Sequence, residues 1–319
     1  MTSDATSGKA GAALALTAAV ISGFAVFTNA YAVKAFGDAT VYTTAKNLVA
    51  AIVLGALLLT VRLRGSHPHG WWPRGSRPCG LRQWGGLAAI AVIGGSVPFI
   101  LFFKGLATTS ASSAAFIQKS LVVWVALLAV PLLHERLGVR HAVAIAALVY
   151  GQALLGGGVH ALRLASGTIM IFAATLLWAA ETVVARRLLA SLSPLTVGTA
   201  RMGGGVIILA GYTLCTTRWS TLSAIGWHQW SWAILTGLIL AAYVATWFAA
   251  LARATAIDVT ALLVPGAIIT ALLQAGVQGT ALAPQWPGLA LVVAGTAGLM
   301  LTVLRERRRS VDTRPAVVR

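Results

Sequence analysis

The sequence is short of charge, above all of negative charge, and of cysteine. Of its 319 residues only 10% are charged and only seven are Asp or Glu, whereas about a quarter of a soluble domain is charged. The two cysteines, Cys79 and Cys215, have no CxxC partner and no nearby histidine ligands, so we expect no metal site, no cofactor and no disulfide. The lack of charge excludes a soluble globular protein.

Long apolar runs take the place of the missing charge. Hydrophobic residues make up 58% of the chain, and a run of about 18 residues or more can cross a hydrocarbon core of about 30 Å. Lipid offers the backbone no hydrogen-bond partners, so each run is predicted to be a helix. The expected fold is an all-α integral membrane protein with about ten transmembrane helices, at 11–32, 40–61, 85–106, 109–132, 140–158, 167–187, 194–215, 230–252, 258–279 and 286–304.

The cations outside these spans are distributed unevenly. With the N-terminus in the cytoplasm, seventeen Lys and Arg residues fall in cytoplasmic segments and at cytoplasmic helix ends, and the outer loops hold only Lys34, Arg163 and Arg218. The positive-inside rule therefore predicts a multi-pass protein of the cell membrane with both termini in the cytoplasm. The net charge of +17 is explained by this topology. Because the charges lie in short separate loops, we expect no nucleic-acid partner.

The two halves of the chain resemble each other. Phe102–Ala107 matches Trp247–Ala252 at an offset of 145 residues, and Ala45-Lys46 matches Ala200-Arg201 at an offset of 155. Five spans per half is an odd number, so the second half is predicted to be inserted upside down. Two inverted halves are typical of transporters with a midplane site. The expected parts are a cytoplasmic N-terminus (1–10), two five-helix repeats (11–158 and 167–304) and a basic cytoplasmic tail (305–319).

Several motifs resemble the EamA-type branch of the drug/metabolite transporter superfamily. Leu133-His134-Glu135-Arg136-Leu137 looks like the Gly-Glu-Arg-Leu ending of that family's fourth helix, with His134 in place of glycine. Leu176–Ala179 with Ala185–Leu188 resembles its sixth helix, and Trp247–Ala252 its eighth. The second half departs from the pattern, because Gly279-Thr280 stands where the acidic ending would recur.

This resemblance, over about residues 11–305, implies a ten-helix transporter with a central cavity between the repeats. It implies small metabolites as substrates, commonly amino acids or related amphipathic compounds, often moved outward across a bacterial inner membrane. Lys46 and Arg201 fall where the family often has a basic residue in helices two and seven.

Ionisable residues inside spans are costly, so each is a functional candidate. Glu181 is the one carboxylate well inside a predicted span, and Arg201 lies at a matching depth in the next span. We expect the two to form an ion pair. The pair either is purely structural, or Glu181 takes up a proton or releases Arg201 during transport.

Two lysines lie in spans of the first half. Lys46 either pairs with Asp38 or remains free to meet an anionic group. Lys119, beside Gln118, is near the midplane with no carboxylate at its depth. A buried lysine without a counter-charge loses its proton or binds an anion, so Lys119 either contacts the cavity and substrate or bonds to helix carbonyls.

The remaining candidates are uncharged. Trp178 and Trp247 either pack between helices or line the cavity. Asn29 shares one face of the first span with Ser22. The pattern also predicts helix kinks at two prolines within spans, Pro98 and Pro265.

Together these features predict a secondary transporter of small amphipathic or anionic metabolites. The alternatives are an exporter of cationic drugs that uses Glu181 and, behind it, a channel or a membrane-embedded enzyme. The spans contain no HExxH or GxSxG motif and the chain has no nucleotide-binding loop, so we name no catalytic residues. The sequence leaves open proton coupling and the oligomeric state.

Overall fold

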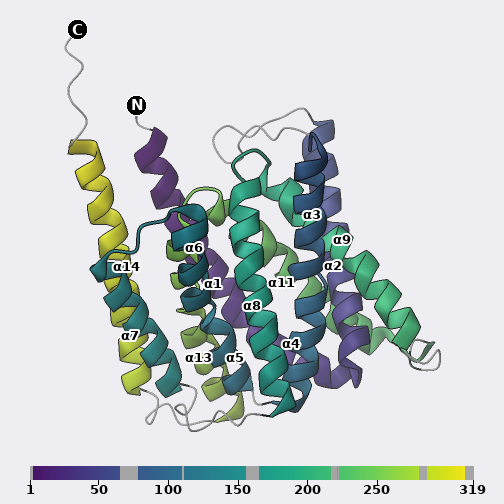
Figure 1. Cartoon of the computed structure of the whole chain (residues 1–319). Helices are drawn as coiled ribbons and strands as arrows, with labels where there is room; N and C mark the ends of the chain where they lie inside the picture. Colours follow the sequence, from purple (N-terminus) through teal and green to yellow (C-terminus); the bar gives the residue numbers. More distant parts are fainter. Residues whose placement is uncertain are drawn as a thin grey trace.

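Every regular element in the described part of the chain is a helix (Figure 1). The computed structural model describes residues 3–64, 78–109, 111–155, 165–216, 221, 223–279 and 286–312. The first half contains α1 (Ser3–Phe36), α2 (Ala39–Leu63), α3 (Leu81–Ile93), α4 (Val97–Thr108), α5 (Ala111–Lys119), α6 (Leu121–Leu133) and α7 (Val139–Leu155). The second half contains α8 (Ser166–Leu188), α9 (Pro194–Thr216), α11 (Trp227–Leu251), α12 (Ala256–Ala261), α13 (Gly266–Gln278) and α14 (Trp286–Asp312).

Several helical segments are long and apolar enough to cross a membrane. Within the described residues there are seven, and two shorter apolar helices accompany them at Val139–Leu155 and Trp286–Thr302. The seven are Lys9–Phe36, Ala39–Leu63, Leu81–Thr108, Ser113–Leu133, Ser166–Leu188, Trp227–Leu251 and Ala256–Val277. The chain is therefore a multi-pass membrane protein.

Three of the predicted spans are not continuous helices. The third is interrupted between α3 and α4 at residues 94–96, the fourth at Ser120, and the ninth between α12 and α13 at residues 262–265. Pro98 and Pro265 lie at two of these interruptions, as predicted, because proline cannot donate the backbone hydrogen bond of a continuous helix. At the first interruption, Ser96 Oγ donates to the carbonyl of Ala91 at 2.9 Å.

The first and last helices are longer than predicted. The segment 1–10 was expected to precede the first helix, but α1 already begins at Ser3. The tail 305–319 was expected to follow the last helix, but α14 continues to Asp312. Residues 313–319 lie outside the described residues, as do 156–158 at the end of the first predicted repeat.

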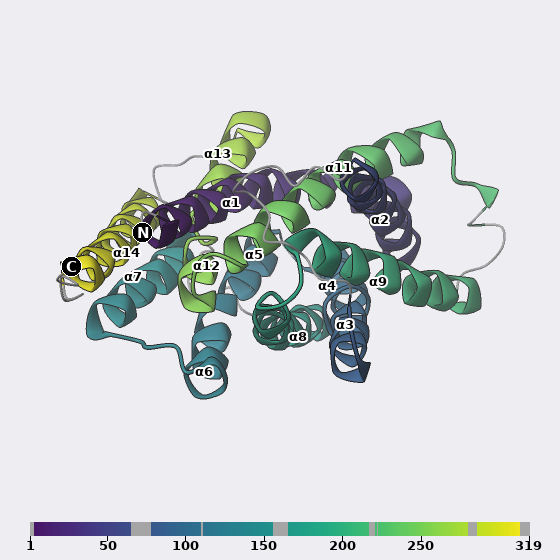
Figure 2. The ribbon, with the colours of Figure 1, turned by 90° about the horizontal axis from the view of Figure 1, so that it is seen from above.

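The halves pack around each other in a reciprocal way. α1 packs against α11 and α13, and the corresponding helix of the second half, α8, packs against α3, α4 and α6. Two pairs of corresponding helices contact each other directly, α2 with α9 and α7 with α14 (Figure 2). The residues between these pairs come from both halves, so a site in the centre is built by both.

Close contacts show which helix ends lie beside each other. Gly11 in α1 packs against Arg253, just after α11 ends, whereas Gly167 at the start of α8 packs against Thr108 at the end of α4. At the far end of α8, Arg187 Nη2 donates to the carbonyl of Leu132 at 2.7 Å. α1 begins and α14 ends on the same side of the molecule (Figure 1).

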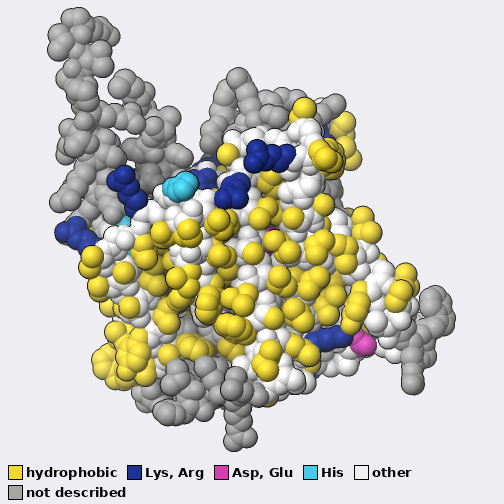
Figure 3. Space-filling model, in the orientation of Figure 1, with side chains coloured by type: hydrophobic (Ala, Val, Ile, Leu, Met, Phe, Trp, Pro, Cys, Tyr) yellow, Lys and Arg dark blue, Asp and Glu magenta, His cyan; other side chains and the backbone are white. Residues whose placement is uncertain are grey.

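The surface is that of a protein surrounded by lipid. Large apolar side chains are exposed along the helices, among them Ile207, Val277 and Leu301. In Figure 3 they cover the middle of the face shown, and Lys and Arg side chains gather mainly near the side on which α1 begins. Apolar surface in this amount is stable only against hydrocarbon.

One residue of the sequence motif has an unusual backbone. His134, which follows α6, adopts a left-handed conformation with φ of 55°. Gly279, 145 residues later, follows α13 with φ of 67°. Glycine reaches this region without steric cost. This is a physical reason for glycine at the end of these helices, and His134 occupies the position with a Cβ.

Replacing His134 by glycine is therefore expected to stabilise the protein. The expected gain is about 1 kcal/mol, measured as a rise of a few degrees in the unfolding temperature in detergent. His134→Ala is the matched control, because alanine keeps a Cβ at the same φ and gains nothing. Equal unfolding temperatures for the glycine and alanine variants would contradict this explanation.

Candidate functional site

The candidate site is a cavity between the two halves, with a volume of about 100 Å³. Residues of α1, α2, α4, α5, α6, α8, α9 and α11 line it, together with Leu263 between α12 and α13. The eight candidate site residues from the sequence are among them: Asn29, Lys46, Gln118, Lys119, Trp178, Glu181, Arg201 and Trp247. The structure thus brings together side chains that are spread over more than two hundred residues of sequence.

The centre of the site is a buried ion pair between α8 and α9. Arg201 Nε of α9 donates to one carboxylate oxygen of Glu181 of α8, and Arg201 Nη2 donates to the other at 3.1 Å. Glu181 is 3% exposed and Arg201 5%. The ion pair expected from the sequence is therefore present. Two-point contact of a guanidinium with a carboxylate compensates both charges in a medium without water.

The interruption between α3 and α4 is packed directly against this pair. A Cβ on Gly94 would overlap the Glu181 carboxylate, and one on Gly95 would overlap the backbone carbonyl of Arg201. The indole Nε1 of Trp178 donates to the Gly94 carbonyl at 3.2 Å, which satisfies a backbone group freed by the interruption. The two glycines therefore permit the close approach, and the ion pair and the broken helix form one packed unit.

Lys46 lies in an aromatic cage. Its ammonium is 3.8 Å from the ring centre of Phe103 and 5.3 Å from those of Phe99 and Tyr42. The expected alternative of a pair with Asp38 is wrong, because the Asp38 carboxylate accepts two backbone N–H bonds at the start of α2. Among the described residues, Lys46 has these cation–π contacts and no carboxylate partner, although it is only 2% exposed.

Lys119 lies at the end of α5, where the fourth predicted span is interrupted. Its ammonium donates to Ser22 Oγ of α1 at 3.0 Å, and the residue is 4% exposed. One of the two sequence-based alternatives was a hydrogen bond from Lys119 to helix carbonyls. In the structure the acceptor is instead the hydroxyl of a serine side chain. The neighbouring Gln118 also lines the cavity, and its Oε1 is buried without a hydrogen-bond partner in the described part of the chain.

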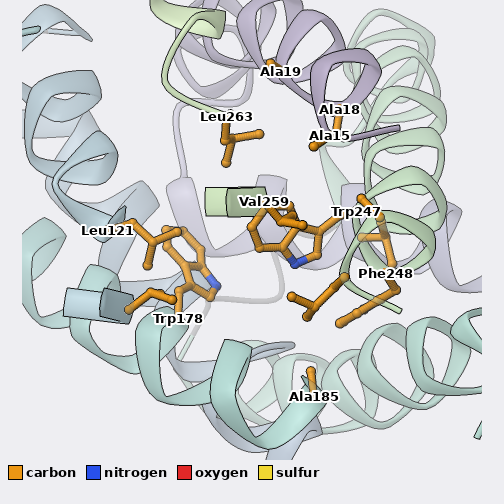
Figure 4. Packing of buried hydrophobic residues seen from close by; sticks show 14 of the residues in the cluster. Ala15, Ala18, Ala19, Leu121, Trp178, Ala185, Trp247, Phe248, Val259 and Leu263 are labelled. Carbon is orange, nitrogen blue, oxygen red and sulfur yellow. The ribbon is translucent and has the colours of Figure 1, made fainter. Parts of the chain in front are cut away.

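Aromatic rings form much of the cavity wall. Trp247 of α11 stacks on Tyr243 with ring centres 6.0 Å apart, and Trp178 of α8 packs edge-on against Phe99. Figure 4 shows the indoles of Trp178 and Trp247 projecting from their helices toward the same interior space. Trp178 therefore packs against α4, Trp247 stacks on a residue of its own helix, and both line the cavity.

The side chain of Asn29, which lines the cavity, links α1 to α2 by a hydrogen bond. Its Oδ1 accepts a hydrogen bond from the hydroxyl of Tyr42, which joins α1 to α2 beside the aromatic cage. Sequence reasoning missed this tyrosine and the phenylalanines of α4. Phe99, Phe102 and Phe103 recur at the spacing of one helical face and could have been found by that signal.

A second polar cluster near the start of α12 was also missed. The Glu135 carboxylate accepts the backbone N–H groups of Ala256 and Ile257 at 2.7 and 3.1 Å. Beside it, His141 Nε2 lies 3.3 Å from a carboxylate oxygen of Asp258. Negative charge is favourable at a helix N-terminus, so Glu135 ties the end of α6 to α12 in the other half.

Comparison with known proteins agrees with this two-half construction. The sequence model described as "EamA-like transporter family" matches residues 9–157 and, a second time, residues 165–301. The chain belongs to the EamA-like transporter family. The two matches cover most of the chain, so the EamA-like domain occurs twice in it. The resemblance seen in the sequence motifs is thereby confirmed.

Other comparisons concern the fold. A solved structure described only as "Crystal structure of protein" superposes on this EamA-like chain with a TM-score of 0.69 and 17% sequence identity, covering 90% of this chain and 99% of that one. At this identity the likeness shows a shared fold alone. No curated protein matches the chain.

The ion pair gives a direct stability test. Arg201→Met leaves the Glu181 carboxylate buried without a counter-charge and is expected to destabilise the protein by about 3–5 kcal/mol. The double variant Glu181→Gln/Arg201→Met removes both charges and is expected to recover most of that loss. Thermal unfolding in detergent measures both. Equal losses in the single and double variants would show that the two charges do not depend on each other.

Proposed function

We propose that this EamA-like protein is a secondary transporter that exports small amphipathic or anionic metabolites, such as amino acids, by alternating access. The observation that carries the proposal is a central cavity, shared by both halves, in which Lys46 and Lys119 have no carboxylate partner among the described residues. A buried ammonium without a counter-charge favours a ligand that supplies one. Gln118, Asn29 and the tryptophans would orient that ligand.

Alternating access needs two halves that can exchange roles. We propose ten spans in two inverted five-helix repeats, 11–158 and 167–304. The start of α1 lies beside the end of α11, and the start of α8 beside the end of α4, which supports opposite insertion of the halves. The cavity would then open to each side in turn.

The basic residues support an orientation with both termini in the cytoplasm. Lys and Arg gather near the side on which α1 begins (Figure 3), and cytoplasmic segments of membrane proteins are enriched in these residues. Export from a cell, through the inner membrane of a bacterium, would thus start on that side.

The alternative of a cationic drug exporter depends on Glu181. Both of its carboxylate oxygens bond to Arg201, so a cation would have to displace a guanidinium held at two points. Proton coupling through Glu181 would require the same separation. The geometry therefore favours anion recognition by the lysines.

A ligand screen with a transport readout tests the proposal. We expect zwitterionic or anionic metabolites to raise the unfolding temperature of the purified protein. At a ligand concentration of a hundred times the Kd, the free energy of unfolding should increase by about 2.7 kcal/mol. Lys119→Met should abolish this rise. The stabilising compound should leave preloaded proteoliposomes that contain the wild type, and not those with Lys119→Met.

The matched control is Lys104→Met. Lys104 also lies in a predicted span, but its ammonium donates to the Tyr212 hydroxyl at 2.7 Å and does not line the cavity. This variant should retain both ligand stabilisation and efflux. Stabilisation by cationic dyes that is lost only in Glu181→Gln would overturn the anion proposal in favour of the drug-exporter alternative.

A further inference from the structure

The charges that line the cavity do not balance. Its ionisable lining residues with formal charge are Lys46, Lys119, Arg201 and Glu181. Arg201 and Glu181 compensate each other through their two-point contact. Two ammonium groups remain, and no carboxylate of the described chain meets either one. Each is buried, so in the absence of a ligand each loses most of its hydration without a counter-charge in return.

The two ammonium groups lie in different surroundings within the cavity. Lys119 bonds to Ser22 of α1. Lys46 lies against the ring of Tyr42, whose hydroxyl bonds to Asn29 of the same helix. Seven residues of helix separate Ser22 from Asn29, which is roughly 10 Å along the axis. The two ammonium groups therefore have different neighbours in the cavity, Ser22 for Lys119 and the rings of Tyr42, Phe99 and Phe103 for Lys46.

The wall of the cavity that the two lysines share is mainly apolar. Phe99, Phe102, Leu106, Leu121 and Val26 line the cavity together with the two tryptophans. The volume of about 100 Å³ is below the roughly 150 Å³ of a cavity known to admit benzene. A slender apolar chain therefore suits this space better than a bulky ring.

We propose that the cavity recognises a substrate with two anionic groups, one at each end of a slender apolar body. One anionic group meets Lys119 beside Ser22, and the other meets Lys46 at the aromatic cage. This inference rests on the proposed transport function and narrows its substrate class to dianions. The Glu181–Arg201 pair stays closed and contributes no charge to recognition.

A series of linear dicarboxylates tests the spacing directly on the wild-type protein. Succinate, adipate, suberate and sebacate are compared with butyrate, hexanoate, octanoate and decanoate by thermal shift and by calorimetry. We expect the best dicarboxylate to bind at least about tenfold more tightly than its length-matched monocarboxylate, because it makes a second charge-assisted contact. Affinity should pass through a maximum within the series, because only one spacing fits both lysines.

The advantage of a dicarboxylate over its monocarboxylate should depend on both lysines, because each one binds one of the two carboxylates. Lys46→Met and Lys119→Met should both reduce the best dicarboxylate to the affinity of its monocarboxylate, whereas Lys104→Met should leave the difference intact. Lys46→Gln and Lys119→Gln repeat the test with polar side chains, should the methionine variants fold poorly. An advantage that survives removal of either cavity lysine overturns the proposal.

The possible failures are distinguishable. Equal affinity for dicarboxylates and monocarboxylates overturns the two-anion inference, and so does a response limited to zwitterions or to neutral compounds. In both cases a transport function of the cavity would still stand. No stabilisation by any small molecule, together with no efflux from proteoliposomes, overturns the inference and the proposed function at once.

Discussion

A charge inside a membrane protein needs a partner, because hydrocarbon solvates none, and this requirement organises the whole centre of the molecule. The Glu181 carboxylate is acceptable at its depth because Arg201 meets both of its oxygens. That contact in turn needs room, which the chain provides by interrupting a helix at Gly94 and Gly95. Trp178 then satisfies a carbonyl that the interruption frees. The cavity is the space beside this unit.

The two halves repeat the same arrangement of helices but carry different polar and charged side chains. Glu135 binds the first backbone N–H groups of α12, whereas the matching position of the second half is Thr280, which has no carboxylate. Likewise, Lys119 stands 145 residues before an apolar residue, Val264. The fold is therefore repeated, but the carboxylate that caps α12 and the ammonium group of Lys119 are not. The charged groups proposed to recognise substrate therefore belong to this asymmetry rather than to the shared fold.

Much of the fold and the membership of the site followed from the sequence, because burial in lipid places strong limits on both. Apolar length located the helices, and matching depth was enough to pair Glu181 with Arg201. What failed depended on local geometry. Asp38 caps a helix instead of meeting Lys46, and the aromatic cage depends on how α2 and α4 are rotated toward each other. Hydropathy is insensitive to such rotations and to a single-residue interruption at Ser120.

The central claim is that the cavity opens to each side of the membrane in turn. Ala25 lines it, and both native cysteines are exposed, so Cys79→Ser and Cys215→Ser are combined with Ala25→Cys. A charged, membrane-impermeant maleimide is then applied to right-side-out and to inside-out vesicles. The account predicts labelling of residue 25 from both sides. Labelling from one side only, or from neither, would contradict it.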